Sequence, residues 1–216
     1  MATPIPVLET ARLRLRPFTL DDAATVRALA GAPEVAATTL NIPHPYPEGA
    51  AEAWISTHGE AAANGNSVTW AIVRASDAVL MGAISIGLTK AHQRGELGYW
   101  LGVPFWNQGY TTEAARRVTA FGFAELGLHR VQATCLPRNV ASARVMEKAG
   151  LRYERLLRGY FRKGETFEDV MMYAVLRSEF EDERQLSLCD GSESRRTDQR
   201  GGDDGAPAPA GPDRGP

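Results

Sequence analysis

Alternating apolar and polar residues predict most of the strands in this chain. Residues 11–18 alternate strictly, so that Leu13 and Leu15 face a core while three arginines face the other way. A second pattern ends at Pro104, because proline donates no hydrogen bond to a strand ladder. The expected strands cover about 11–18, 67–75, 80–89, 96–103, 130–136, 152–161 and 167–177.

Helical periodicity and capping residues predict four helices between these strands. Thr19 has the position of an N-cap, and the helix after it runs to about Ala30, where Gly31 and Pro33 close it. Three prolines within residues 43–47 predict an irregular loop, because they fix φ and remove donors. The other helices are expected at about 48–63, 110–126 and 139–149.

The order of these elements, with hairpins at both ends, predicts an α+β fold with a mixed sheet rather than a doubly wound one. From residue 187 onward Gly, Pro, Asp, Arg and Ala dominate, and such a segment buries too little apolar surface to offset its ordering entropy. We therefore expect one domain over residues 8–180 and a disordered tail over 187–216.

Composition excludes several classes of protein. A net charge of −2 implies no polyanionic partner, and no second basic cluster joins the arginines of residues 11–18, so a solvated strand face is favoured over a nucleic-acid site. Cys135, Cys189 and the four histidines lack the spacing of metal ligands, so no metal is expected. No apolar run or leader pattern indicates a membrane span or signal peptide, and we expect a soluble cytoplasmic protein.

The stretch from Glu96 to Ala114 carries the strongest chemical signal. A strand pattern ends in a tight loop at Gly109, and a helical period starts at once. Free N–H groups at the positive end of a helix dipole form a ready site for phosphate. The alternative is a glycine that serves the turn alone, and neither the Walker nor the dinucleotide glycine pattern occurs here.

A second stretch, from Asn139 to Gly150, reads Asn-x-x-Ser-x-x-x-x-Glu-Lys-x-Gly. Together with Gly-Tyr-x-Thr-Glu-Ala at the loop, it resembles the GNAT superfamily of acyl-CoA N-acyltransferases, and within it the Rim-type branch that acetylates ribosomal-protein N-termini. The family loop reads Gln/Arg-x-x-Gly-x-Gly/Ala, and here Gly109 matches while Trp106 and Thr111 depart from it at the two ends. The resemblance covers about residues 8–178.

The resemblance implies a single domain with a mixed, mostly antiparallel sheet of about six to seven strands, a splayed parallel pair and about four flanking helices. The strand that ends near Leu101 and Val103 would part from strand 130–136, and the pantetheine arm of acetyl-CoA, the co-substrate, would fill the gap. A backbone N–H near Leu101 would donate to the thioester carbonyl. The diphosphate would be held by the loop residues Gln108, Gly109, Tyr110, Thr111 and Thr112.

The second stretch supplies two further residues by the same resemblance. Asn139 would contact the cofactor arm through its side-chain amide, although Asn is also a very good helix N-cap. Ser142 would stand near the sulfur as the general acid. Its alternative role is that of a first-turn serine bonded to backbone.

The remaining site residues would serve the acceptor amine. Glu96 would take the amine proton, directly or through water, or it is a solvent-facing strand-end glutamate. Tyr46, and His44 beside it, would lie in the wall of the acceptor cleft, or they belong to a rigid connector. Trp70 and Tyr99 would line the acceptor pocket, although aromatic residues on strands are more often core.

These residues lead to a function hypothesis. We expect an N-acetyltransferase that moves an acetyl group from acetyl-CoA to a primary amine, either a protein N-terminus or a small molecule, in a ternary complex. The alternative is a CoA-binding module without turnover, which regulates or binds a partner. The expected partners are the amine acceptor and, as an option, a second copy in a homodimer, with no nucleic acid or membrane.

Overall fold

The computed structural model describes residues 5–181 and forms one eight-stranded sheet in the order β1-β2-β3-β4-β5-β6-β8-β7. Neighbouring strands are antiparallel except β5 and β6, which confirms the mixed α+β sheet with one parallel pair. The expected six to seven strands were too few. The strands are β1 Leu8–Glu9, β2 Leu13–Arg16, β3 Ser67–Arg74, β4 Leu80–Thr89, β5 Arg94–Leu101, β6 Arg130–Cys135, β7 Arg152–Lys163 and β8 Thr166–Leu176.

The chain divides into two units after Arg177, and the sheet lies wholly in the first. The disordered tail predicted for 187–216 lies outside the described residues. None of the helices within residues 5–181 is both long and apolar enough to cross a membrane. The α-helices are α1 Ala23–Ala30, α2 Pro33–Thr38, α3 Ala50–Ala63, α4 Tyr110–Ala124 and α5 Val140–Lys148.

The short helix α2 is not predicted by the sequence pattern, in which Gly31 and Pro33 indicate only the end of α1. In the structure Pro33 is the first residue of α2, where its missing N–H costs nothing and its fixed φ suits the helix. The described part of the chain therefore holds five α-helices, rather than about four.

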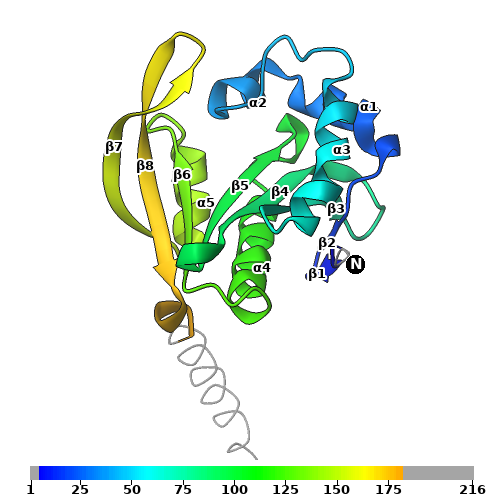
Figure 1. Ribbon diagram of the computed structural model, residues 1–216. Helices are drawn as coiled ribbons and strands as arrows, with labels where there is room; N and C mark the ends of the chain where they lie inside the picture. Colours follow the sequence, from blue (N-terminus) through cyan, green and yellow to red (C-terminus); the bar gives the residue numbers. More distant parts are fainter. Residues whose placement is uncertain (1–4, 182–216) are drawn as a thin grey trace, which may run out of the picture. The chain divides into compact units, whose positions relative to one another are not determined.

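The helices cover the two faces of the sheet separately. Helices α1 and α3 pack on one face in an apolar cluster that includes β3 and β4, while α4 packs on the other with α5 beside it (Figure 1). Trp70 faces α4, where its ring meets Phe121 at a centroid distance of 5.5 Å. The cluster on the first face comprises Ala23, Val26, Ala30, Ala51, Ile55, Ala71, Val73 and Leu80.

The parallel pair β5–β6 joins two arms of the sheet, an N-terminal arm of β1–β5 and a C-terminal arm of β6–β8. Pairing runs from Arg94 opposite Arg130 to Leu97 opposite Ala133, and it stops there although β5 continues to Leu101. Beyond this point the two arms diverge, and α2 lies across the top of the view between them (Figure 1).

Candidate active site

The parting of β5 and β6 leaves main-chain groups of β5 without a neighbouring strand. Alternate residues of an antiparallel strand bond to the same side, and the Gly102 amide donates to the Met81 carbonyl of β4 at 2.9 Å. Tyr99 and Leu101 therefore direct their amides and carbonyls toward the gap. The Leu101 carbonyl is taken by the Trp106 indole N–H at 2.7 Å, so at Leu101 the amide is the group that can still bind a ligand.

The turn after β5 has the geometry of an anion-binding loop. Gly109, with φ +79°, is the N-cap of α4, and Asn107 before it is also left-handed. Within the described residues, no acceptor is recorded for the amides of residues 108–112. Val103 does not continue the strand as expected: β5 ends at Leu101, and Val103 opens a single 3₁₀ turn, Val103–Phe105. Pro104 explains the change, because it cannot extend the ladder.

Arg12 immediately precedes β2 and stands beside this loop, a position that the sequence did not indicate. Its guanidinium donates to the Gln108 carbonyl at 3.1 Å, lies 4.7 Å above the Tyr110 ring and pairs with Glu113 at 2.7 Å. Burial raises the pKa of the Glu113 carboxyl, but hydrogen bonds from Thr10 and Arg12 outweigh burial and lower it overall. The loop thus has a cation at its edge, and Glu113 is turned toward β2.

Asn139 caps α5, as its alternative role predicts. Its side-chain carbonyl accepts from the Ser142 amide at 3.0 Å, and its side-chain N–H donates to the Thr38 carbonyl of α2 at 3.1 Å. Both ends of the amide thus have partners within the protein. A contact between Asn139 and the cofactor stays a prediction.

Ser142, Tyr99 and Cys135 meet at the gap from three different elements. The Ser142 hydroxyl is 2.8 Å from the Tyr99 hydroxyl, and Ser142 is only 9% exposed. Burial raises the pKa of the Tyr99 hydroxyl, and it raises the pKa of the Cys135 thiol to about 11 despite a hydrogen bond with Ser142. All three groups are therefore protonated at neutral pH, and Ser142 is within a chain of groups that can pass a proton.

Glu96 lies on the opposite face of β5 from Tyr99, because successive side chains of a strand alternate. It is half-buried, and its Oε2 accepts from the Gln132 side-chain amide of β6 at 3.0 Å. The predicted base and the predicted acid therefore approach the gap from opposite faces of the sheet.

The three aromatic residues expected near the acceptor have different positions. Trp70 is fully buried, and its indole N–H donates to the Pro6 carbonyl at 2.7 Å, which favours a core role over a substrate role. Tyr46 packs at the edge of the α1–α3 cluster, where burial raises the pKa of its hydroxyl. Only Tyr99 is brought to the gap. His44 bonds through Nδ1 to the Gly31 carbonyl at 3.1 Å.

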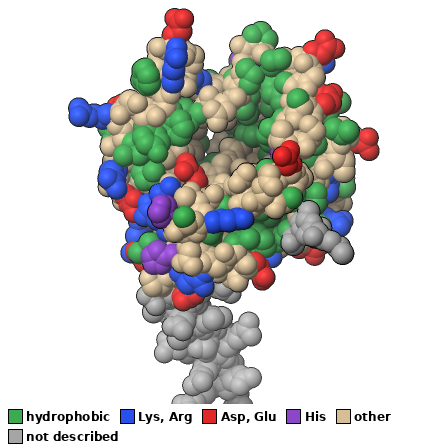
Figure 2. Space-filling model, in the orientation of Figure 1, with side chains coloured by type: hydrophobic (Ala, Val, Ile, Leu, Met, Phe, Trp, Pro, Cys, Tyr) green, Lys and Arg blue, Asp and Glu red, His purple; other side chains and the backbone are tan. Residues whose placement is uncertain are grey.

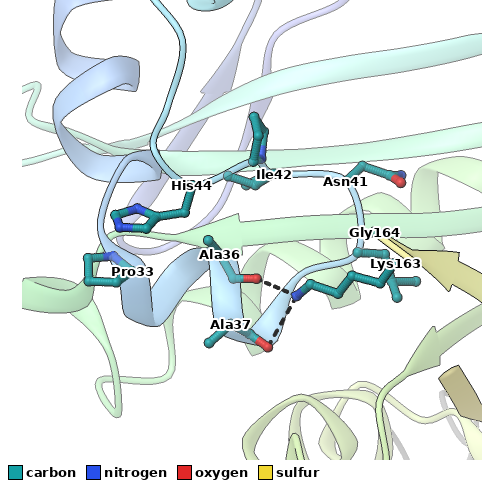
Figure 3. Close-up of a pocket in the computed structure, with 10 residues that line it drawn as sticks. Pro33, Ala36, Ala37, Asn41, Ile42, His44, Lys163 and Gly164 are labelled. Carbon is teal, nitrogen blue, oxygen red and sulfur yellow. Dashed lines mark hydrogen bonds between the residues drawn. The ribbon is translucent and has the colours of Figure 1, made fainter. Parts of the chain in front are cut away.

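A pocket of about 620 Å³ lies where α2 meets the tip of the β7–β8 hairpin. Lys163 crosses to α2 and donates to the carbonyls of Ala36 at 2.6 Å and Ala37 at 3.5 Å (Figure 3). It also donates to the carbonyl of Thr39, just after α2, at 2.7 Å. The space-filling view shows a hollow between the two arms of the sheet (Figure 2). The pocket is lined by Pro33, Ala36, Ala37, Leu40, Asn41, Ile42, Pro43, His44, Lys163 and Gly164.

A parted parallel pair beside a helix N-terminus with free amides suits an extended cofactor that carries phosphate. Comparison with protein families agrees: residues 12–152 match the acetyltransferase (GNAT) domain, and the chain belongs to this family. It is thus an acyl-CoA-dependent N-acetyltransferase by class. This confirms the resemblance seen in the loop and in the Asn139 stretch.

Individual relatives point the same way. The chain is 31% identical over 173 residues to the uncharacterized N-acetyltransferase YoaA of Bacillus subtilis, which covers 80% of this chain and 97% of that protein. A solved GNAT-family acetyltransferase from Bacillus anthracis is 26% identical with a TM-score of 0.71, covering 79% of this chain and 98% of that one. RimL, a ribosomal L7/L12 α-N-protein acetyltransferase solved with coenzyme A, shares the fold at 15% identity, with a TM-score of 0.72 and coverage of 79% and 98%.

Proposed function

We propose that this protein transfers an acetyl group from acetyl-CoA to a primary amine by direct attack in a ternary complex. One observation carries the proposal: β5 and β6 part after Leu97, and the unpartnered amides at the start of α4 follow the same strand. The gap suits an extended pantetheine arm that pairs with strand edges, and the amides suit a diphosphate.

Residues along the gap then each have a role in binding acetyl-CoA. The Leu101 amide donates to the thioester carbonyl and stabilises the charge that develops on its oxygen. The amides of residues 108–112 and the nearby Arg12 bind the diphosphate, and Asn139 borders the arm at the start of α5.

Proton transfer completes the reaction. Glu96 takes one proton from the acceptor ammonium, the amine nitrogen bonds to the carbonyl carbon, and the carbon–sulfur bond breaks as the nitrogen gives its second proton to water. The leaving thiolate takes a proton from Ser142, which recovers one from Tyr99, and Tyr99 is reprotonated from solvent. An α-amine has a pKa of about 8, so a carboxylate suffices as base near neutral pH.

The acceptor is a protein N-terminal α-amine or a small-molecule amine. RimL acts on a ribosomal protein, and its likeness to this chain extends to the fold alone. The hollow between the two arms is the proposed entry for the acceptor, because Asn139 and the pocket-lining Lys163 donate to the adjacent carbonyls of Thr38 and Thr39. We place the acceptor in this hollow, with Tyr46 near its wall.

A thiol-release assay tests the proposal. Purified protein, acetyl-CoA and a panel of N-terminal peptides and small amines are followed with a thiol-reactive dye, and CoA binding is measured in parallel by calorimetry. Turnover with any amine supports the enzyme. CoA binding without turnover across the panel favours the alternative, a non-catalytic CoA-binding module, for which Asn139 with both side-chain ends already bonded is the supporting observation. No CoA binding contradicts both.

A further inference from the structure

A row of polar side chains crosses the sheet from β7 to the predicted base on β5. Glu154 of β7 holds the Arg130 guanidinium through two bonds of 2.6 and 2.7 Å. Arg130 Nε donates to the Gln132 side-chain carbonyl at 3.1 Å, and the Gln132 side-chain amide donates to Glu96 Oε2 at 3.0 Å. The row therefore ends on one oxygen of the Glu96 carboxylate.

The chemistry of the two neighbours fixes which way the Gln132 amide points. Arg130 can only donate hydrogen bonds, and an ionised Glu96 can only accept them. The Gln132 oxygen must therefore face Arg130 and its nitrogen must face Glu96, since the flipped amide would lose both bonds. Gln132 is only 5% exposed, so either loss would leave a buried polar group unsatisfied.

The row also leaves the other carboxylate oxygen available. Within the described residues no partner is recorded for Glu96 Oε1, whereas Oε2 is held by Gln132. Glu96 immediately precedes Leu97, the last residue of β5 that pairs with β6, so its side chain stands where the gap begins. The charged residues on the same face of the neighbouring strands include Arg130 and Glu154, and also Arg152, which pairs with Ala174 opposite Gln132; Arg94 precedes Glu96 on β5.

We propose that Gln132 is a positioning residue for the acetyl-transfer reaction: it holds one oxygen of Glu96 so that the other faces the acceptor amine. Arg130 and Glu154 anchor Gln132 in turn. This inference rests on the proposed function, since it assigns no role to Gln132 apart from Glu96. A general base must lie within hydrogen-bond reach of its proton, and a swinging carboxylate meets this condition only part of the time.

A double-mutant cycle tests the proposal in the full-length protein. Gln132→Met keeps the length of the side chain and removes its amide. It should lower kcat by about tenfold with an unchanged KM for acetyl-CoA. Glu96→Gln should lower kcat further, and adding Gln132→Met to it should cost nothing more, because the residue that Gln132 positions is already gone.

The pH of the assay supplies a readout that a purely structural role would not move. Above a pH of about 8 an α-amine loses its own proton, so the need for a base declines. The deficits of Glu96→Gln and Gln132→Met should therefore shrink together as the pH rises. Gln93→Met is the matched control, because the Gln93 side chain is exposed at the turn before β5, and its kcat should equal that of the wild type.

Gln132→Asn covers the case in which the methionine variant fails to fold. It keeps the amide but withdraws it from Glu96, and the same loss of kcat is expected. The inference would be overturned if a folded Gln132 variant kept the kcat of the wild type, or if Gln132→Met lowered kcat as much in the Glu96→Gln background as in the wild type. The proposed function would still stand in either case, because the wild-type protein would remain active. Absence of turnover in the wild type would count against the proposed function itself.

Discussion

The boundary between β5 and β6 has a closed half and an open half, and the two differ in what satisfies the backbone. In the closed half, Arg94–Leu97 pairs with residues 130–133 of β6, and Val131 and Ala133 are fully buried beneath it. In the open half, Tyr99 and Leu101 face a strand that has moved away. The closed half is held by ladder bonds and apolar packing, whereas in the open half side chains bond where the ladder would continue.

Side chains from other elements stand in the open half where the ladder would continue. Tyr99 reaches Ser142 of α5, and Trp106 takes the Leu101 carbonyl. Unpaired buried backbone groups are costly, so a strand edge kept open in this way is a place where an extended ligand gains free energy by binding. The comparison predicts that truncating the buried apolar side chains of the closed half affects stability, and that changes in the open half, or at the polar pair Glu96 and Gln132, affect CoA binding or turnover.

The largest expected effect sets the pH range in which the two halves can be compared. His58 of α3 is 7% exposed between Phe18 and Trp54, no partner is recorded for either ring nitrogen in residues 5–181, and burial lowers its pKa to about 4. As the pH falls, His58 is therefore protonated in the unfolded chain before it is protonated in the folded protein. The contribution of neutral His58 to the free energy of unfolding is complete above a pH of about 6.5 and is lost as the pH falls toward 4, by up to about 3 kcal/mol.

Thermal unfolding between pH 4 and 8 measures this loss. His58→Phe should flatten the acid limb of the stability curve, since phenylalanine has no proton to bind. If His58→Phe loses as much stability at low pH as the wild type does, the loss is caused by other titrating groups. Turnover is best compared above pH 6.5, where the fold is unaffected.

The second effect concerns the anion loop of the open half. Gly109→Val places a β-branched residue at φ +79° and disturbs the amides at the start of α4, so CoA affinity should fall about tenfold to a hundredfold. Calorimetry with CoA measures it. Gly49→Val is the control, because Gly49 is also a helix N-cap, with φ +73° and open space around it. Gly49→Val should lose a similar amount of stability and keep its affinity for CoA. Equal losses of CoA affinity in both variants would contradict a role of the Gly109 loop in binding CoA.

The third effect belongs to the closed half. Val131 is completely buried between the sheet and α4, so Val131→Ala should lower the free energy of unfolding by about 2 kcal/mol through lost burial and a small cavity. Urea denaturation gives the stability, and the KM for acetyl-CoA should not change. A raised KM for acetyl-CoA at unchanged stability would mean that packing in the closed half also affects cofactor binding in the open half.

The smallest expected effect concerns the protonation of the leaving thiolate by Ser142 in the open half. Ser142→Ala should lower kcat by about tenfold and leave CoA affinity nearly unchanged, because only the leaving thiolate loses its donor. Ser56→Ala is the control, since Ser56 is also a helix serine, but its hydroxyl donates to the Ala53 carbonyl at 2.7 Å on the exposed side of α3, away from the gap. Wild-type turnover in Ser142→Ala would remove Ser142 from the mechanism.

Local patterns in the sequence were sufficient for most of the fold. Alternation placed β3, β4 and β8 within a residue or two, and Gly109 and Asn139 marked the starts of α4 and α5. Pro33 was misjudged because proline both ends one helix and begins another, and its immediate neighbours do not distinguish the two. Trp70 carried no sign of which face of β3 is core, because that strand is buried on both faces.

By itself, the sequence determined the order of the longer strands and helices, although not β1 or α2, together with the glycine turn into α4 and the family motifs, because each depends on residues close together in the chain. Only the tertiary structure decided where β5 and β6 part, that Arg12 flanks the loop and that Gln132 holds Glu96. Arg12 and Glu113 are 101 residues apart, and Gln132 and Glu96 are 36 apart. Such contacts follow from strand register and packing, which no local pattern encodes.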